Sequence, residues 1–332
     1  MLRTRHSRIV ACAASAVLAL AIAPTDIRAA ELLKARLAQN LAPISALAIV
    51  AKANGLFEKH GLDIAVSNFT SGKQCLDTVV GGGADIATTA EAPVTAAAMA
   101  GQPIAFVAGM EYSDLKTVTA ATAGIRTKAD LRGKTIAFTA GTGSEVYTAR
   151  LLKSAGLTPS DVTLVNLRPQ DMLPALAAGS IDAFDTWEPH ISNARKALGE
   201  NATLLDTRGV YSETFNIVVM RAYLDANPAL VGKFLAALIE AETFVKANPD
   251  AAIATVADAV GMKRDELAAI WPDYVYRVRI DDRLLDTLKI HAAWRLDSGN
   301  HPPNATMPDF TKVLALEPLR SLDPSRISVS AN

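Results

Sequence analysis

The side chains best suited to hold a small molecule fall in two series, each placed in loops that follow expected strands. The first series comprises Asn40, Leu41, Ser71, Lys73, Thr89, Glu91 and Glu111. The second series comprises Gly141, Thr142, Gly143, Ser144, Arg168, Asp185 and Trp187. Open α/β sheets bind their ligands at the carboxyl ends of the strands. We therefore expect both series to face one binding site that works by hydrogen bonding, charge and ring stacking.

The stretch from Gly141 to Ser144 opens an expected helix. Its free backbone N–H groups could hold an anionic oxygen, and its glycines allow close approach of a ligand. The alternative is helix capping, with Thr142 as the N-cap and Glu145 reaching back to it. Both roles are compatible if the Ser144 hydroxyl stays free, and we expect it to contact ligand.

The charged members of the two series predict opposite ligand charges. Lys73 and Arg168 could hold an anion, although a solvated surface charge is the commoner role for either. Glu91, Glu111 and Asp185 instead favour a cationic or hydrogen-bond-donating ligand. Glu91 also has the alternative of capping a helix or bridging two lobes. The residues alone leave the sign of the ligand charge open.

Trp187 is the aromatic candidate, and it directly follows an expected strand. An indole at the edge of a cleft can stack on a planar or apolar part of a ligand. Packing on the neighbouring helix is the alternative for this side chain.

Two similar halves organise the chain, because Gly82–Glu91 and Gly179–Glu188 both fit the pattern G-x-x-D-x-x-x-T-x-E. Each pattern ends a run of expected strands and helices in the order β-α-β-α-β. Alternating strands and helices indicate an α/β fold with parallel strands. We therefore expect a two-lobed clamp, each lobe a mostly parallel sheet flanked by helices, that closes on a small ligand.

Two expected strands carry the chain between the lobes. Residues 104–110 leave the first lobe, and residues 214–220 return to it, which makes two crossovers. We expect lobe I to comprise residues 30–112 plus 218–310, and lobe II to comprise residues 113–217.

The two ends of the chain carry no expected ligand contacts. Residues 1–29 have the basic start, the short apolar run and the small residues of a secretory signal peptide, with a short membrane anchor as the alternative. The stretch after His301 is rich in Pro and Ser and is expected to be loop, with residues 311–332 as a C-terminal tail. Removal of the signal would leave Cys75 as a lone cysteine, expected to pack as a small hydrophobic side chain.

The sequence offers little for catalysis or for nucleic acid. The net charge of the chain is −1, a balance that does not suggest a nucleic-acid partner. The histidines after the signal show no close metal-binding spacing, and no G-x-S-x-G or P-loop pattern occurs. We therefore expect no catalytic residues, no metal and no cofactor.

Five stretches resemble the periplasmic substrate-binding proteins of ABC importers for aliphatic sulfonates, taurine and nitrate. They are residues 51–62, 81–93, 127–136, 182–189 and 224–228. The resemblance implies a monomer, secreted to the periplasm, that captures a small molecule such as a sulfonate, taurine, nitrate or a related compound. It also implies delivery of that ligand to an ABC permease in the membrane.

The resemblance identifies the fold and the transport role better than the ligand. An exported ligand sensor of the same fold, or binding of a thiamine-type pyrimidine, are the alternatives. The pyrimidine-synthesising enzymes of this fold have a cysteine-rich stretch that this sequence lacks.

Overall fold

The computed structural model describes residues 1–2 and 31–329. Nearly all of the predicted signal peptide lies outside the described residues and stays a prediction. Within the described part of the chain, no helix is both long enough and apolar enough to cross a membrane.

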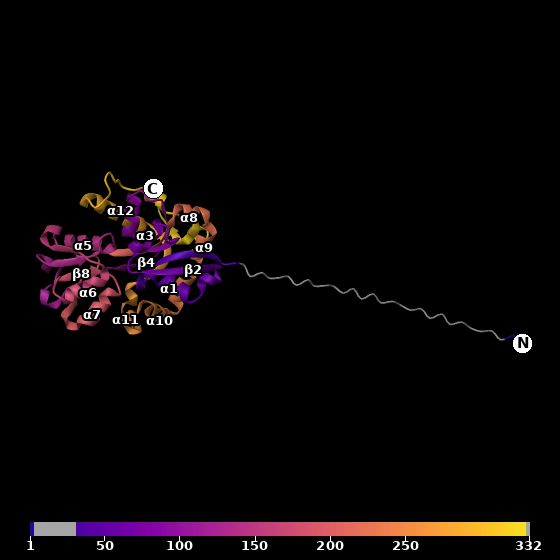
Figure 1. Ribbon diagram of the computed structural model, residues 1–332, viewed down its shortest axis with the longest axis horizontal. Helices are drawn as coiled ribbons and strands as arrows, with labels where there is room; N and C mark the ends of the chain where they lie inside the picture. The colour runs from indigo at the N-terminus through magenta and orange to yellow at the C-terminus, as the bar shows by residue number, and fades with distance from the viewer. Residues whose placement is uncertain (3–30, 330–332) are drawn as a thin grey trace. The chain divides into compact units, whose positions relative to one another are not determined.

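Two separate sheets form the framework of residues 32–329 (Figure 1). The larger sheet has seven strands, in the order β12 (Ile327–Ser328), β11 (Val275–Asp281), β4 (Ile104–Asp114), β10 (Ser212–Met220), β3 (Ile86–Ala90), β1 (Leu33–Asn40) and β2 (Leu62–Phe69). The smaller sheet has five, in the order β7 (Thr163–Asn166), β6 (Thr135–Phe138), β8 (Ala183–Thr186), β5 (Lys116–Ala120) and β9 (Ala202–Leu204). The two sheets with flanking helices confirm the predicted α/β class.

Each sheet contains the predicted β-α-β-α-β unit with the same strand order. In the larger sheet β1 pairs in parallel with β2 and β3, and in the smaller sheet β6 pairs in parallel with β7 and β8. An antiparallel strand then extends each unit, β10 beside β3 and β5 beside β8. Parallel pairing is therefore concentrated in the repeated units, and antiparallel strands extend both sheets.

The repeated aspartates have equivalent structural roles in the two units. Asp85 accepts the backbone N–H of Arg36 on β1 at 2.8 Å, and its own N–H donates to the Arg36 carbonyl at 2.9 Å. Asp182 accepts the N–H of Thr135 on β6 at 2.8 Å and donates to the Thr135 carbonyl at 2.8 Å. Each aspartate thus ties the start of the third strand of its unit to the first strand.

Helices cover both sheets, and Figure 1 shows them on opposite sides of the strands. Those of the larger sheet are α1 (Ala46–Ala53), α2 (Leu56–Lys59), α3 (Gly72–Val80), α4 (Glu91–Met99), α8 (Arg221–Ala226), α9 (Pro228–Ala247), α10 (Pro249–Val260), α11 (Arg264–Ile270) and α12 (Asp282–Ser298). Those of the smaller sheet are α5 (Gly143–Ser154), α6 (Pro169–Ala177) and α7 (His190–Leu198).

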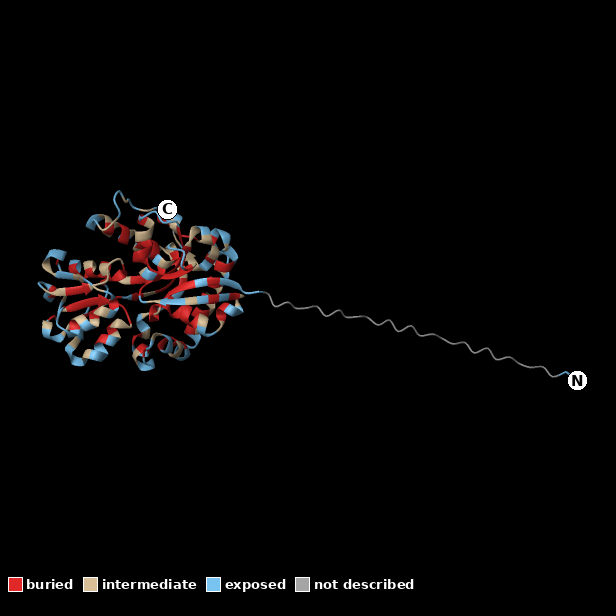
Figure 2. Ribbon diagram, viewed as in Figure 1, coloured by how far each residue is buried: buried red, intermediate tan, exposed pale blue. Residues whose placement is uncertain are grey.

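Buried apolar side chains hold the helices to the sheets. Figure 2 shows buried residues along the strands and on the helix faces that point toward them. In α9, the apolar residues at helical spacing (Leu230, Val231, Phe234, Leu235 and Leu238) are all buried. Cys75 is also fully buried, so its predicted role as a small hydrophobic side chain is confirmed.

The chain passes between the sheets twice, as predicted. The first crossover runs from β4 to β5 with Leu115 between them, and the second joins β9 to β10 through residues 205–211. The two crossovers lie side by side, because β4 and β10 are still paired where Asp114 meets Ser212.

The C-terminal segment differs from the expected loop. It contains α13 (Phe310–Val313), α14 (Glu317–Arg320) and β12, which pairs in parallel with β11. The Ala315 N–H also donates to the carbonyl of Phe106 on β4 at 2.8 Å. These long-range hydrogen bonds, which local composition does not indicate, order the segment against the larger sheet.

Candidate functional site

The N-termini of three helices meet where the two predicted series of loops come together. At Gly72, the first residue of α3, an added Cβ would stand 2.8 Å from the Thr89 Cα, so this close packing requires glycine. At Gly141 an added Cβ would stand 2.9 Å from Cε of Lys73. The Lys73 side chain, on the larger sheet's side, therefore lies over the loop before α5, and the two series face each other.

The loop before α5 is capped by its own side chains. Thr142 is the N-cap, as predicted, and its hydroxyl accepts the N–H of Ser144 at 3.2 Å. Glu145 reaches one residue further back than expected and accepts the N–H of Gly141 at 2.8 Å. The Ser144 hydroxyl donates to the carbonyl of Asp185 at 2.7 Å and accepts the N–H of Thr139 at 3.0 Å. The expectation of a free Ser144 hydroxyl is therefore wrong, because it joins α5 to β8.

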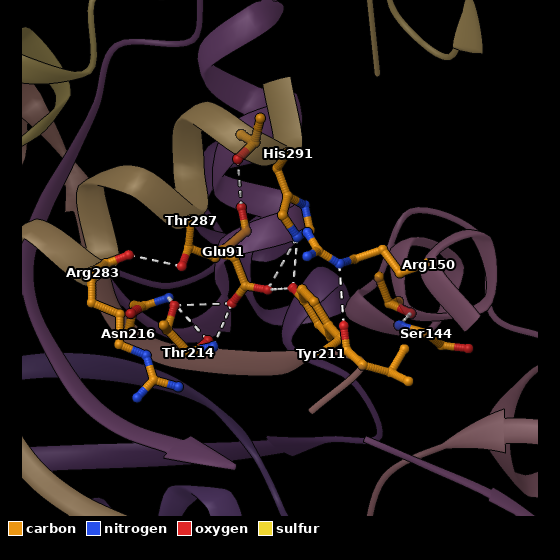
Figure 3. Close-up of polar contacts among 12 residues, drawn as sticks. Glu91, Ser144, Arg150, Tyr211, Thr214, Asn216, Arg283, Thr287 and His291 are labelled. Carbon is orange, nitrogen blue, oxygen red and sulfur yellow. Dashed lines mark hydrogen bonds and ion pairs between the residues drawn. The ribbon is translucent and has the colours of Figure 1, made fainter. Parts of the chain in front are cut away.

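Glu91 is fully buried at the start of α4, and its carboxylate contacts groups from β10 and α12 (Figure 3). One oxygen accepts the N–H of Thr214 at 2.6 Å and the Thr214 hydroxyl at 2.9 Å. The other oxygen accepts the hydroxyl of Tyr211, which lies 2.6 Å from Nε2 of His291. Residues of this chain thus satisfy both oxygens of Glu91.

The titration of this cluster is governed by burial. Burial raises the pKa of Glu91 to about 7, against the opposing effect of its hydrogen bonds. Burial lowers the pKa of His291 to about 3, so the imidazole is neutral at physiological pH. Because Tyr211 has one hydroxyl hydrogen and donates it to Glu91, a neutral His291 that carries its proton on Nε2 completes the chain of hydrogen bonds.

Glu111 and Glu213 form a second group of buried carboxyls, 3% and 4% exposed. Both oxygens of Glu111 are buried without a partner of good hydrogen-bond geometry, and the nearby Ser113 hydroxyl opposes the rise in its pKa. An added Cβ on Gly143 would stand 2.6 Å from Oε2 of Glu213, so this carboxyl lies at the N-terminus of α5. Burial and the proximity of Glu213 raise the pKa of Glu111 well above its usual value.

Aromatic rings border these carboxyls. The rings of Tyr274 and Tyr276 stack at 5.6 Å with a 4° interplanar angle. The Tyr276 hydroxyl donates to the carbonyl of Pro43 at 2.9 Å, which fixes the pair beside the loop after β1. Burial and the charges of Tyr276, Glu188, Glu111 and Glu213 raise the pKa of Tyr274. Glu111 lies opposite Tyr276 in the pairing of β4 with β11.

Trp187, at 9% exposed, faces Tyr274 across a small space between the two sheets. This space also touches Ile44 and Glu188 and has a volume of about 10 Å³. That is room for roughly one water molecule. The space as it stands is too small for a larger ligand.

Several predicted polar residues end in buried atoms that lack a partner. The atoms are Oδ1 of Asn40, Oγ1 of Thr89 and Nε1 of Trp187, together with Oγ1 of the neighbouring Thr186. Buried polar groups are nearly always hydrogen-bonded, and exceptions commonly mark a site that water or a ligand satisfies. These atoms come from the ends of β1, β3 and β8, where the sequence predicted the site.

The remaining predicted residues have other surroundings. Leu41 is half-buried, and Ser71 caps α3 by accepting the N–H of Gln74 at 3.3 Å. Asp185 is fully buried within the smaller sheet, where its carboxyl bonds hydroxyl groups of that sheet and of α5. Arg168 is exposed and bonds Asp171 at 2.8 Å, as a solvated surface charge does.

A larger cavity of about 600 Å³ runs along the crossovers from Tyr112 to Lys116 and from Leu204 to Arg208. None of the predicted ligand residues lines it. Among residues 31–329, no three His, Cys, Asp or Glu side chains are grouped so as to hold a metal ion.

Sequence reasoning missed Glu213 and Tyr274. Glu213 lies at the start of β10, just before the predicted returning strand, and Tyr274 lies just before β11. Both fall outside the repeated units that directed attention to strand ends. The aromatic run Trp271, Tyr274 and Tyr276 was the one signal that could have pointed to this region.

Solved structures with this architecture define the class. The periplasmic aliphatic sulphonate binding protein SsuA from Escherichia coli superposes with a TM-score of 0.72 at 23% identity, covering 85% of this chain and 92% of that chain. The alkanesulfonate-binding protein SsuA from Xanthomonas axonopodis pv. citri, bound to MOPS, gives a TM-score of 0.76 at 22% identity and covers 87% and 100%. The chain therefore has the periplasmic-binding-protein fold.

Sequence comparison adds the family. A protein of Escherichia coli (strain K12) named as a putative aliphatic sulfonates-binding protein is 29% identical over 231 residues, which cover 67% of this chain and 70% of that protein. The family described as NMT1/THI5 like matches residues 42–252. The chain belongs to the NMT1/THI5-like family.

Proposed function

We propose that the chain is the solute-binding component of an ABC importer, which captures a small molecule between its two lobes and delivers it to a membrane permease. The observation that carries this proposal is the pair of equivalent β-α-β-α-β units whose strand ends face each other across buried, unpartnered polar atoms. Two such units joined by two adjacent crossovers are suited to closing around a ligand.

The names of the relatives support this role and suggest ligands. Two solved structures with this fold are named for sulphonate or alkanesulfonate binding. Sulfonates are therefore the first compounds to test for this chain, together with taurine and nitrate, for which two further relatives are named. Location in the periplasm and export by an N-terminal signal belong to the same proposal.

Ligand capture can be tested by small-angle scattering and thermal unfolding of the full chain with a panel of small solutes. A true ligand is expected to compact the molecule, because the lobes close on it. It should also stabilise the folded state by about 2.7 kcal/mol at a concentration of 100 times Kd. The absence of both effects across anionic, neutral and cationic solutes would contradict the proposal.

Delivery can be tested in proteoliposomes that contain the permease and ATPase encoded by the same host. We expect ATP-driven uptake of the ligand only when the chain is present. The alternative of an exported sensor predicts ligand binding without any contribution to uptake. The variant Trp187→Ala provides the matched control, since it should weaken ligand binding and uptake together.

A further inference from the structure

Three buried carboxyl groups lie in the region between the two lobes. Glu111, Glu188 and Glu213 are each less than 7% exposed, and the phenol of Tyr274 interacts electrostatically with all three. Arg277, Arg279 and Arg283 line a small space beside Glu111. Arg279 pairs with Asp281 at 2.8 Å, and the guanidinium of Arg283 lies over the Tyr112 ring, 3.9 Å from the centroid.

Lys116, a cation that acts on Glu188, is bound to Asp273 at 2.6 Å. In the free protein, burial raises the pKa of Glu111 and Glu213 well above the usual value. A positive charge supplied from outside would favour the ionised form of these carboxyls and be stabilised by it.

The unpartnered atoms of this region are mainly acceptors. Both carboxyl oxygens of Glu111 and the amide oxygens of Asn40 and Asn216 lack a donor of good hydrogen-bond geometry. Each of these residues is at most 3% exposed. Nε1 of Trp187 is also unpartnered, and it is the one atom among these five that can only donate a hydrogen bond. A ligand that carries several N–H donors would satisfy more of these atoms than a ligand that carries only acceptors.

The helix N-termini that could hold an anion already have acceptors of their own. Ser71 caps α3, and Thr142 and Glu145 cap the start of α5. The first residue of α4 is Glu91, and the carboxyl of Glu213 lies against the first residue of α5. Negative side chains offset the positive end of a helix dipole. These helix starts are therefore less suited to a sulfonate or nitrate than bare N–H groups would be.

The rings beside the carboxyls suit a cation with an apolar part. Trp187 and Tyr274 line the same space between the lobes, and the ring of Tyr276 stacks on that of Tyr274. Ring faces attract cations, and the attraction grows when the pair is removed from water. Buried carboxyls and aromatic faces together favour a positively charged nitrogen compound.

We propose that the ligand is a small cationic nitrogen compound, an amine, amidine or guanidine, whose N–H groups donate to Glu111 and Glu213 while its apolar part packs on Trp187 and Tyr274. This inference rests on the proposed role in solute capture and specifies its ligand class. It separates this chain from the relatives named for sulfonates.

The test is titration calorimetry of the full chain with two groups of probes. Benzamidine, agmatine and phenethylamine represent the cations, and methanesulfonate, taurine and nitrate represent the anion-bearing compounds. We expect at least one cation to bind, with affinity reduced at least tenfold in Glu111→Gln and in Glu213→Gln, because each variant loses a charged hydrogen-bond acceptor. Glu240→Gln is the matched control, since Glu240 pairs with Lys59 on the surface of α9 and its loss should leave affinity unchanged.

The two glutamine variants should stay folded, because each removes a buried carboxyl and keeps its shape. Circular dichroism and thermal unfolding check this directly. A second readout is the number of protons exchanged on binding, measured in buffers of different ionisation enthalpy near pH 7. A cation favours the ionised form of the buried carboxyls and should release protons, whereas an anion should take them up.

The outcomes separate this inference from the role it rests on. Binding of methanesulfonate or nitrate, with no cation bound and with affinity kept or raised in Glu111→Gln, would overturn the cationic ligand and support solute capture. Cation binding that Glu111→Gln and Glu213→Gln leave unchanged would overturn the assigned carboxyls. Failure of every probe to bind or to compact the chain would contradict both the ligand class and the proposed function.

Discussion

Asp185→Asn should change how the stability of this protein depends on pH. Asp185 is fully buried in β8, and its oxygens lie 2.7 Å from the Thr117 hydroxyl and 2.6 Å from the Thr148 hydroxyl. The Thr148 hydroxyl also lies 2.8 Å from the carbonyl of Ser144. The Thr148 hydroxyl has one hydrogen, so it cannot donate to both the Ser144 carbonyl and Asp185. If Asp185 is protonated and donates to Thr148, Thr148 can donate to Ser144 and all of these hydrogen bonds form together.

The magnitude follows from the shift in pKa. Burial raises the pKa of Asp185 from 3.8 to about 7, which corresponds to about 4 kcal/mol of unfolding free energy. Because the folded pKa is the higher one, this stabilisation is complete below about pH 4 and is lost as pH rises through about 7. The carboxamide of the Asp185→Asn variant cannot ionise, so the variant should lack this component. Its stability relative to wild type should therefore improve by up to about 4 kcal/mol toward alkaline pH.

Urea denaturation from about pH 4 to about pH 8 measures the difference in unfolding free energy. Asp63→Asn, at an exposed position on β2, is the control and should follow the wild-type curve. Glu91 and the other buried carboxyls are present in both proteins, so their contributions cancel in the comparison. A difference between Asp185→Asn and wild type that stays constant across this range would refute the reasoning.

Three further predictions concern packing and the repeated units. Gly72→Ala should destabilise the fold by about 1–3 kcal/mol, because its methyl group would overlap the Thr89 backbone, where the Cα would stand 2.8 Å away. Gly232→Ala in α9, where an added Cβ meets nothing within 4 Å, should instead stabilise by up to about 1 kcal/mol. Urea denaturation distinguishes the two. Cys75 should resist alkylation in the native state, since burial removes access and raises the pKa of its thiol. Labelling that is equally fast with and without urea would contradict its burial. Asp182→Ala should cost about 1–3 kcal/mol by leaving a strand N–H without its acceptor. Thermal unfolding that is unchanged from wild type would exclude this role.

Much of the fold could be predicted because the same order of strands and helices occurs twice along the sequence. The spacing of Gly82, Asp85 and Glu91 matches that of Gly179, Asp182 and Glu188, and both sets take the same places in their sheets. The aspartates bond backbone groups of the first strand in each unit, which explains the shared spacing. The C-terminal segment could not be predicted in this way, because its strand is ordered by pairing with β11, about 47 residues earlier.

The site was predicted less completely than the fold. Strand ends identified Asn40, Thr89 and Trp187, whose buried polar atoms lack partners. The partners of the Ser144 hydroxyl and the Glu91 carboxylate could not be predicted, because they come from strands 41 and 123 residues away. Glu213 belongs to no repeated unit, and its side chain reaches the site where it meets Gly143 at the start of α5.

The pairing of Asp114 with Ser212 determines how the smaller sheet could be exchanged between related chains. The residues between them leave the larger sheet and rejoin it at neighbouring positions, so the smaller sheet is connected in the manner of an inserted cassette. A cassette joined at two adjacent points can be lengthened, shortened or exchanged without redirecting any strand of the host sheet. Chimaeras of related chains, cut at Leu115 and in residues 205–211, should therefore conserve the frame of the larger sheet while replacing the smaller sheet's side of the candidate site.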